Sequence, residues 1–250
     1  DIDKLIEGTN EILTANRNSL QLFDMLHSMR QFDDLTYVHS VNVALIASIL
    51  GQWLKFSEKD IRILTISGLL HDIGKIMIPN EILTKPGKLT VAEYNIMKQH
   101  VNFGYEKVKN QNIDIRIKEA CLLHHEKCDG TGYPFGLKSD HIPAVAKIIA
   151  IADVYDAMTS ARVYRGALCP FEVIDTMYKD AFTKFEPEYI LPFLKNVASS
   201  YINNDVRLSD GRIGKVVLIN ENALSLPIVQ CEDEFIDLSK TRELTVSAIL

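Results

Sequence analysis

The sequence contains few cysteines and no closely spaced pair of them. Only four of its 250 residues are cysteine, at Cys121, Cys128, Cys169 and Cys231, and no two form a C-x-x-C motif. This spacing does not predict a thiolate zinc site or a disulfide framework. Free thiols in a chain of this size indicate a reducing compartment, so we expect a cytoplasmic protein.

Long apolar runs, a signal peptide and an excess of positive charge are also missing. No apolar run approaches the ~18 residues of a membrane-spanning helix, and we expect no membrane span in this segment. The start, Asp1–Lys4, lacks both the basic and the apolar part of a signal peptide. It also lacks Met, so we expect further chain upstream that holds a regulatory domain. The net charge of -6 argues against a DNA-binding face, although bound metal ions could still attract a small anion.

The composition is that of a globular protein with an ample core, 47% hydrophobic and 24% charged. Apolar residues recur at helical spacing up to about residue 203 and then alternate, which is typical of strands. We therefore expect a mainly α fold with a small C-terminal β appendage. The expected divisions are a helix or linker at 1–30, a helical catalytic domain at 31–203 and a β subdomain at 204–250. The apolar stripe of 1–30 permits either a link to the upstream domain or a homodimer contact.

Caps and turn residues set the expected boundaries of the elements. Gly74 is expected to end the second long helix, and His100 to lie near the middle of the third. We expect helices at 33–55, 61–70, 90–109, 113–125, 144–161, 170–183 and 187–201, and strands at 215–220, 227–231, 235–238 and 244–250.

Histidines and aspartates gather at the inner faces or ends of these helices. A single histidine on an apolar helix is more often a hydrogen-bonded core residue, and a single aspartate is usually solvated. A His-Asp pair, a His-His pair, lone histidines and an aspartate in an apolar helix are together hard to explain as packing, because a buried charge costs free energy unless it is paired or bound to metal. The candidate metal ligands are His39, His71, Asp72, His100, His124, His125 and Asp153.

These residue types suit borderline divalent ions, because imidazole and carboxylate ligands without thiolate are typical of such sites. Seven ligands are too many for one ion and fit two, with Asp72 as the bridge. Adjacent helical side chains diverge by roughly 100°, so His124 and His125 could each face a different metal. Two metals about 3.5–4 Å apart can share a hydroxide, lower its pKa and stabilise displacement at phosphorus. The pattern predicts a dinuclear phosphohydrolase, with iron or manganese preferred over zinc or nickel.

Three motifs then point to a known family. The segments are His71–Lys75 (HDIGK), His124–Pro134 (HHEKCDGTGYP) and Ile148–Arg165. Together they resemble the HD-GYP domain, the branch of the HD phosphohydrolase superfamily known for cyclic di-GMP phosphodiesterases. The resemblance covers about residues 30–200, with the motifs in the family's order, and it implies an HD-type helical bundle.

The resemblance also implies roles for individual residues. The same seven side chains would hold the metals, and Asp72 and Lys75 would be the catalytic residues, with Lys75 on the scissile phosphate. Tyr133 would line the nucleotide site, while Arg162 and Arg165 would grip phosphate or guanine. Some members bind a third metal through a Glu four residues before the first histidine. This chain has Leu35 there, so we expect two metals.

The implied reaction is hydrolysis of cyclic di-GMP to the linear dinucleotide pGpG and on to GMP. Two alternatives remain open: a phosphodiesterase for another cyclic dinucleotide such as cyclic GMP-AMP, and a sensor that binds such a nucleotide without cutting it. The complete ligand set argues against the sensor. Glu126, Asp129 and Asp156 are expected to brace the site from behind.

Overall fold

The computed structural model describes residues 34–160, 168–241 and 243–250. The chain divides into two compact units, Asp1–Asp156 and Ala157–Leu250. The boundary falls inside helix α9, and the helices α10 and α11 group with the C-terminal strands. The division expected at 203/204 stays a prediction.

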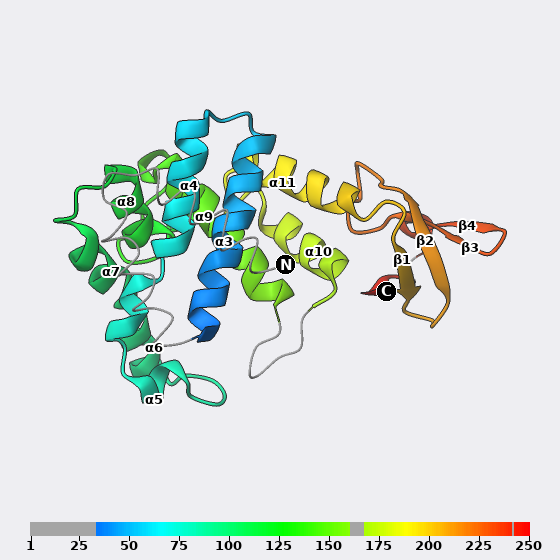
Figure 1. Ribbon diagram of the computed structural model, residues 1–250. Helices are drawn as coiled ribbons and strands as arrows, with labels where there is room; N and C mark the ends of the chain where they lie inside the picture. The colour runs from blue at the N-terminus through cyan, green and yellow to red at the C-terminus, as the bar shows by residue number, and fades with distance from the viewer. Residues whose placement is uncertain (1–33, 161–167, 242) are drawn as a thin grey trace. The chain divides into compact units, whose positions relative to one another are not determined.

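The first unit is helical, as predicted from the apolar spacing. Its helices α3 and α4 run side by side, joined by a short turn (Figure 1). Ser57 caps α4, and its side chain accepts a hydrogen bond from the amide of Asp60. The elements are α3 (Asp34–Trp53), α4 (Glu58–Leu70), η1 (Ile73–Met77), α5 (Asn80–Leu83), α6 (Val91–Met97), α7 (His100–Val108), α8 (Ile115–Leu123), η2 (Ser139–His141) and α9 (Ala144–Thr159).

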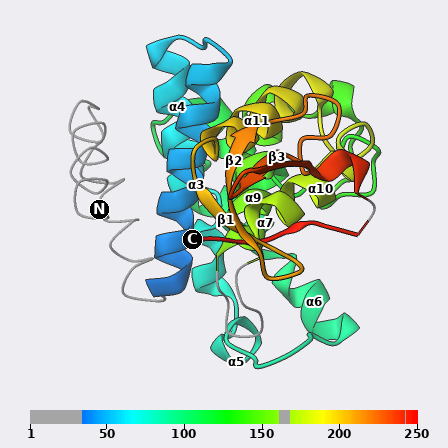
Figure 2. The ribbon, with the colours of Figure 1, turned by 90° about the vertical axis from the view of Figure 1, so that its right-hand side faces the viewer.

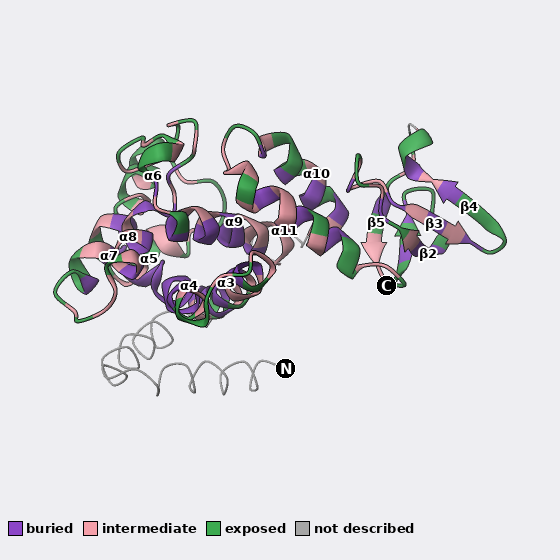
Figure 3. Ribbon diagram, turned by 90° about the horizontal axis from the view of Figure 1, so that it is seen from above, coloured by how far each residue is buried: buried purple, intermediate pink, exposed green. Residues whose placement is uncertain are grey.

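The core of this unit is formed by the buried faces of helices that include α4, α8 and α9 (Figure 3). By length and composition, Leu35–Trp53 of α3 could cross a membrane, which we did not expect from the sequence. This is weak evidence, because the core helix of a globular unit passes the same test. Since α3 packs along α4 and fully buries Val43, Ala47 and Leu50, we assign it to the core.

Two local expectations were wrong. Gly74 does not end α4, which stops at Leu70. It lies in the following turn η1, where an added Cβ would overlap the backbone of α7 at His100 and Gly104. Glycine is needed here for close approach of two backbones rather than for a helix cap. The expected helix at 90–109 is also interrupted at Lys98, so that His100 begins α7 instead of lying in mid-helix.

The second unit combines two helices with a sheet, and it confirms the β appendage. The sheet is antiparallel, in the order β4-β3-β2-β1-β5. Buried side chains alternate along β1 and the first part of β2, as expected for strands with one face on a core. The first strand was missed from the sequence, and Gly211 forms the expected turn after it with φ +92°. In Figure 2 the strands are seen in front of α10 and α11. The elements are α10 (Pro170–Asp180), α11 (Pro187–Ser200), β1 (Asp205–Leu208), β2 (Ile213–Leu218), β3 (Ile228–Cys231), β4 (Glu234–Asp237), η3 (Leu238–Lys240) and β5 (Val246–Ile249).

Candidate metal centre

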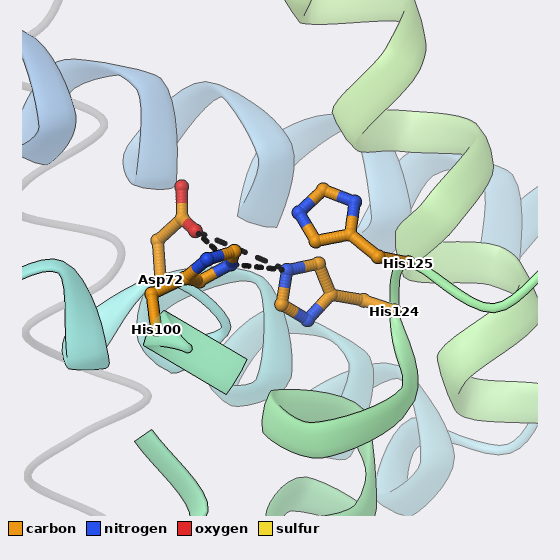
Figure 4. Close-up of side chains that lie close together, drawn as sticks. All are labelled: Asp72, His100, His124 and His125. Atoms are coloured by element: carbon orange, nitrogen blue, oxygen red, sulfur yellow. Dashed lines mark hydrogen bonds and ion pairs between the residues drawn. The ribbon is translucent and has the colours of Figure 1, made fainter. Parts of the chain in front are cut away.

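The seven side chains singled out in the sequence come together inside the first unit. They are delivered by the interiors of α3 and α9, by the C-terminal ends of α4 and α8, and by the start of α7. All are buried except His125, which is partly buried. Four of them converge in Figure 4, where Asp72 and His100 come from separate segments and His124 and His125 from a third.

Three of the histidines each make the same kind of local hydrogen bond, which determines which ring nitrogen carries the proton. The Nδ1 atoms of His71, His100 and His124 lie 2.7, 2.8 and 2.9 Å from backbone carbonyl oxygens three or four residues earlier. A carbonyl only accepts, so each Nδ1 must carry the proton and each neutral ring must present an unprotonated Nε2. Such a nitrogen is the form of histidine that binds a metal ion.

Burial favours the neutral form of His100, His124 and His125. It lowers the pKa of His100, and it lowers the pKa of His124 well below its usual value with help from neighbouring histidines. Burial also lowers the pKa of His125 to about 3. His100, His124 and His125 can therefore ligate at neutral pH without first losing a proton.

Asp72 lies between two groups of histidines. Its Oδ1 is 3.3 Å from His100 Nε2 and 3.9 Å from His124 Nε2 (Figure 4). Its Oδ2 is 3.2 Å from His71 Nε2 and 3.7 Å from His39 Nε2. Burial raises the pKa of Asp72, but Lys75 and His71 outweigh that effect and hold the pKa well below its usual range. The carboxylate is charged and faces both groups.

The donor set has the chemistry of a metal site. Ligand atoms of Asp72, His100, His124 and His125 lie within 4.8 Å of one another, as do those of His39, His71 and Asp72. His71 Nε2 and Asp72 Oδ1 are buried yet have no hydrogen-bond partner among the described residues. Buried polar atoms are normally satisfied, so these two fit a missing cation. His124 and His125 fall in the same group, and the expectation that each faces a different metal stays a prediction.

The seventh residue, Asp153, lies beside His39 at the edge of both groups. Its Oδ1 is 3.0 Å from His39 Nε2, and its Oδ2 is 3.8 Å from His125 Nδ1. On the other side of the ring, His39 Nδ1 is 2.6 Å from Asp156 Oδ2. Burial lowers the pKa of His39, but its hydrogen bonds with Asp153 and Asp156 prevail and raise that pKa to about 9.

Asp156 is itself held in place. Its Oδ1 accepts a hydrogen bond of 2.9 Å from the side-chain amide of Asn42, which lies one helical turn after His39 on α3. The two hydrogen bonds that link Asn42, Asp156 and His39 therefore fix the orientation of the His39 imidazole. Asp156 was expected to brace the site, but its partner His39 and the role of Asn42 were not identified from the sequence.

The Gly-rich loop is braced as expected. Glu126 accepts hydrogen bonds from three successive amides, those of Phe135, Gly136 and Leu137, at 2.7, 3.1 and 2.9 Å. Asp129 accepts from the amide and hydroxyl of Thr131 at the turn. These bonds hold the loop against the end of α8, where it carries Tyr133.

Two of the residues expected to contact substrate line the centre. Lys75 Nζ is 2.6 Å from Asp72 Oδ2, and its side chain is 20% exposed. The Tyr133 ring stacks on His125 with centroids 4.7 Å apart. Arg162 and Arg165 lie outside the described residues, so their expected roles stay predictions.

Comparison with known proteins supports the family assignment. Residues 8–189 match the family model described as HD domain. The chain is 36% identical over 203 residues to "Cyclic di-GMP phosphodiesterase PA4108" of Pseudomonas aeruginosa, covering 81% of this chain and 49% of that protein. It is 36% identical to "Cyclic di-GMP phosphodiesterase response regulator RpfG" of Xanthomonas campestris, covering 78% and 52%. It is 32% identical to "3'3'-cGAMP-specific phosphodiesterase 2" of Vibrio cholerae, covering 76% and 37%. The chain thus spans about half the length of the first two relatives, or less for the third.

Solved structures agree on the fold. A HDG"Y"P protein from Bdellovibrio bacteriovorus superposes with a TM-score of 0.55 at 19% identity, covering 75% of this chain and 60% of that one. The HD domain of the phosphodiesterase PgpH from L. monocytogenes, solved with cyclic-di-AMP, gives 0.55 at 18% identity, covering 71% and 95%. With the family model, the relatives and the three motifs in agreement, this chain belongs to the HD domain family, in its HD-GYP branch.

Proposed function

We propose that this chain is a metal-dependent phosphodiesterase that hydrolyses cyclic di-GMP to pGpG and on to GMP. The observation that carries the proposal is the position of Asp72, whose two carboxylate oxygens face two separate groups of histidine nitrogens. A carboxylate placed in this way can bridge two cations, and paired cations are suited to phosphodiester cleavage. The relatives named as cyclic di-GMP phosphodiesterases give the substrate class.

We assign two divalent ions to the seven side chains. His39, His71 and Asp72 form the first group, and Asp72 with the histidines at 100, 124 and 125 forms the second. Asp153 completes the set through its position between His39 and His125. Imidazole and carboxylate donors without thiolate suit iron, manganese, zinc and nickel, of which we assign iron or manganese. When bound, such ions lower the pKa of a water molecule and offset negative charge at phosphorus.

The chain's own residues supply the remaining functions. Lys75 holds a charged ammonium beside the Asp72 carboxylate, where it can contact a non-bridging phosphate oxygen of the substrate. Tyr133 presents a ring at the edge of the centre and would position a nucleotide there. Arg162 and Arg165 are proposed to bind phosphate or guanine. Burial of the centre excludes bulk water, which strengthens each of these electrostatic contacts.

Hydrolysis of 3',3'-cyclic GMP-AMP is the second candidate. Three relatives carrying this specificity in their names are 32%, 36% and 35% identical to the chain, which overlaps the 32–42% of the relatives named as cyclic di-GMP phosphodiesterases or probable ones. A head-to-head assay separates the two candidates. Protein loaded anaerobically with iron or manganese is given each dinucleotide, and products are resolved by chromatography. If only the mixed compound is cut, the first assignment is wrong.

The same assay tests catalysis against simple sensing. His71→Ala and Asp72→Ala each remove a proposed ligand, and we expect loss of bound metal together with loss of turnover. The control is His141→Ala, which removes an exposed histidine paired with Asp140 on the surface and should change neither. A wild-type protein that binds the nucleotide without metal and cuts nothing would favour the sensor.

A further inference from the structure

Two side chains of α6 lie beside the proposed nucleotide site and have no role in the metal centre. Lys98 Nζ is 5.3 Å from the centroid of the Tyr94 ring and 6.0 Å from that of Tyr133. The Tyr133 ring in turn stacks on His125. The two tyrosines and Lys98 thus form a continuous patch that ends on a proposed metal ligand.

The charge of Lys98 is not neutralised by an ion pair. Lys75 and Lys85 are paired with carboxylates, whereas no carboxylate of the described residues lies within ion-pair distance of Lys98. Its ammonium group instead faces aromatic rings, a contact that leaves its N–H donors available to a ligand. Lys98 is also fixed in position, because it follows α6 directly and its amide caps that helix.

Tyr94 keeps a large free surface. It is 49% exposed, in contrast to Tyr133, which is partly buried. An exposed aromatic ring next to a cation that also contacts Tyr133 suits the flat face of a nucleobase. Neither residue was singled out from the sequence, because Lys98 and Tyr94 read there as ordinary surface residues of a helix.

We infer that Tyr94 and Lys98 form a purine-binding subsite that favours guanine, with the base against the Tyr94 ring and the Lys98 ammonium at its acceptor edge. Guanine presents two acceptors, O6 and N7, on that edge, whereas adenine replaces O6 by an amino donor. An ammonium has three donors and no acceptor, so it matches guanine and opposes the adenine amino group. This inference rests on the proposed function and specifies how that site would select its substrate.

The size of the effect follows from the two contacts. Stacking of one base on an aromatic side chain accounts for roughly 5- to 150-fold in affinity. A good contact to a base edge discriminates between bases by a similar factor. We therefore expect about tenfold effects from single substitutions, which steady-state kinetics resolves.

The experiment uses the metal-loaded chain and two probes, cyclic di-GMP as substrate and cyclic di-AMP as competitor. For Lys98→Met we expect the KM of cyclic di-GMP to rise about tenfold while the inhibition constant of cyclic di-AMP stays the same or falls. For Tyr94→Ala both constants should rise by a similar factor, and Tyr94→Phe should restore them, because stacking needs the ring and not the hydroxyl.

Two matched controls separate binding from folding. Ile96→Ala removes a side chain of α6 that is 42% exposed, two positions from Tyr94 and so on another side of the helix. Lys107→Met removes an exposed lysine from α7. Both should leave KM unchanged.

The outcomes are distinguishable. If Lys98→Met weakens the binding of both nucleotides equally, the charge of Lys98 attracts phosphate, and the guanine assignment is overturned. If Tyr94→Ala leaves both constants unchanged, or if Ile96→Ala reproduces its effect, there is no stacking subsite. If the wild-type chain cuts no cyclic dinucleotide, the proposed function fails instead, and that result is seen before any variant is compared.

Discussion

Replacing Asp156 by Asn should weaken one metal site and spare the other. Asp156 accepts a hydrogen bond from His39 Nδ1 and another from Asn42, so the Asn42–Asp156–His39 chain orients the imidazole toward the centre. In the variant, Asn42 continues to donate to the side-chain oxygen at position 156. The new amide nitrogen then faces His39 Nδ1 and, being a donor, favours the tautomer with its proton on Nε2. That proton occupies the atom that His39 would use to bind a metal.

The magnitude follows from the geometry. The bond between His39 and Asp156 is short, 2.6 Å, and the two side chains are only 10% and 6% exposed. A buried, charge-assisted hydrogen bond of this kind contributes about 1.5–3 kcal/mol. That corresponds to roughly 10- to 150-fold in a dissociation constant. Loss of such a partner behind a metal-binding histidine typically costs about 10–100-fold in metal affinity, which agrees.

The assay is a manganese titration of the metal-free chain by calorimetry, with bound metal counted by mass spectrometry after dialysis. We expect the wild type to hold two ions and Asp156→Asn to hold one ion normally and the second 10- to 100-fold more weakly. Asn42→Ala should act in the same direction but less strongly. The control is Asp140→Asn, which makes the same chemical change in the exposed Asp140–His141 pair.

This reasoning is refuted if Asp156→Asn binds both ions as tightly as the wild type, or if both sites weaken by the same factor. Equal weakening would mean that the substitution disturbs the whole helix pair rather than His39. Unfolding in urea, measured on the same samples, shows whether the variant remains folded.

Two further predictions concern stability. Gly74→Ala should lower the free energy of unfolding by about 1–3 kcal/mol, because the new Cβ overlaps the backbone of α7. The control Gly104→Ala should not lower the free energy of unfolding in this way, because its Cβ would meet its nearest atoms at 3.4 Å or more. Equal losses for the two variants in urea titrations would contradict the packing argument. Hydrogen bonds from Lys85 and Thr90 lower the pKa of Glu93 from 4.5 to about 2. The unfolded chain therefore binds this proton first as pH falls, so the stabilisation is present above about pH 4.5 and is lost toward pH 2. Glu93→Gln should flatten that part of the stability–pH curve, and an unchanged slope in urea titrations at pH 5, 4 and 3 would refute the assignment.

Much of the centre could be predicted from the order of residues alone. The apolar run before His71 and Asp72 and the pair at His124 and His125 placed these side chains at the ends of buried helices, and that is where they lie. Their Nδ1–H bonds to carbonyls three or four residues back are local too, since the accepting carbonyls belong to the last turns of the same helices. The spacing of the three motifs was sufficient to identify the family.

Only the tertiary structure decided which of these groups meet. His39 and Asp156 are separated by 117 positions, and no local pattern indicates that one orients the other. No local pattern indicated that ligand atoms of His124 and His125 would lie in one group, nor that Lys98 would lie near Tyr133. Periodicity reports which face of each helix is buried, whereas contacts between helices depend on how those faces pack against one another. The residue types that make a metal centre are therefore a property of the sequence, and the pairing of their atoms is a property of the fold.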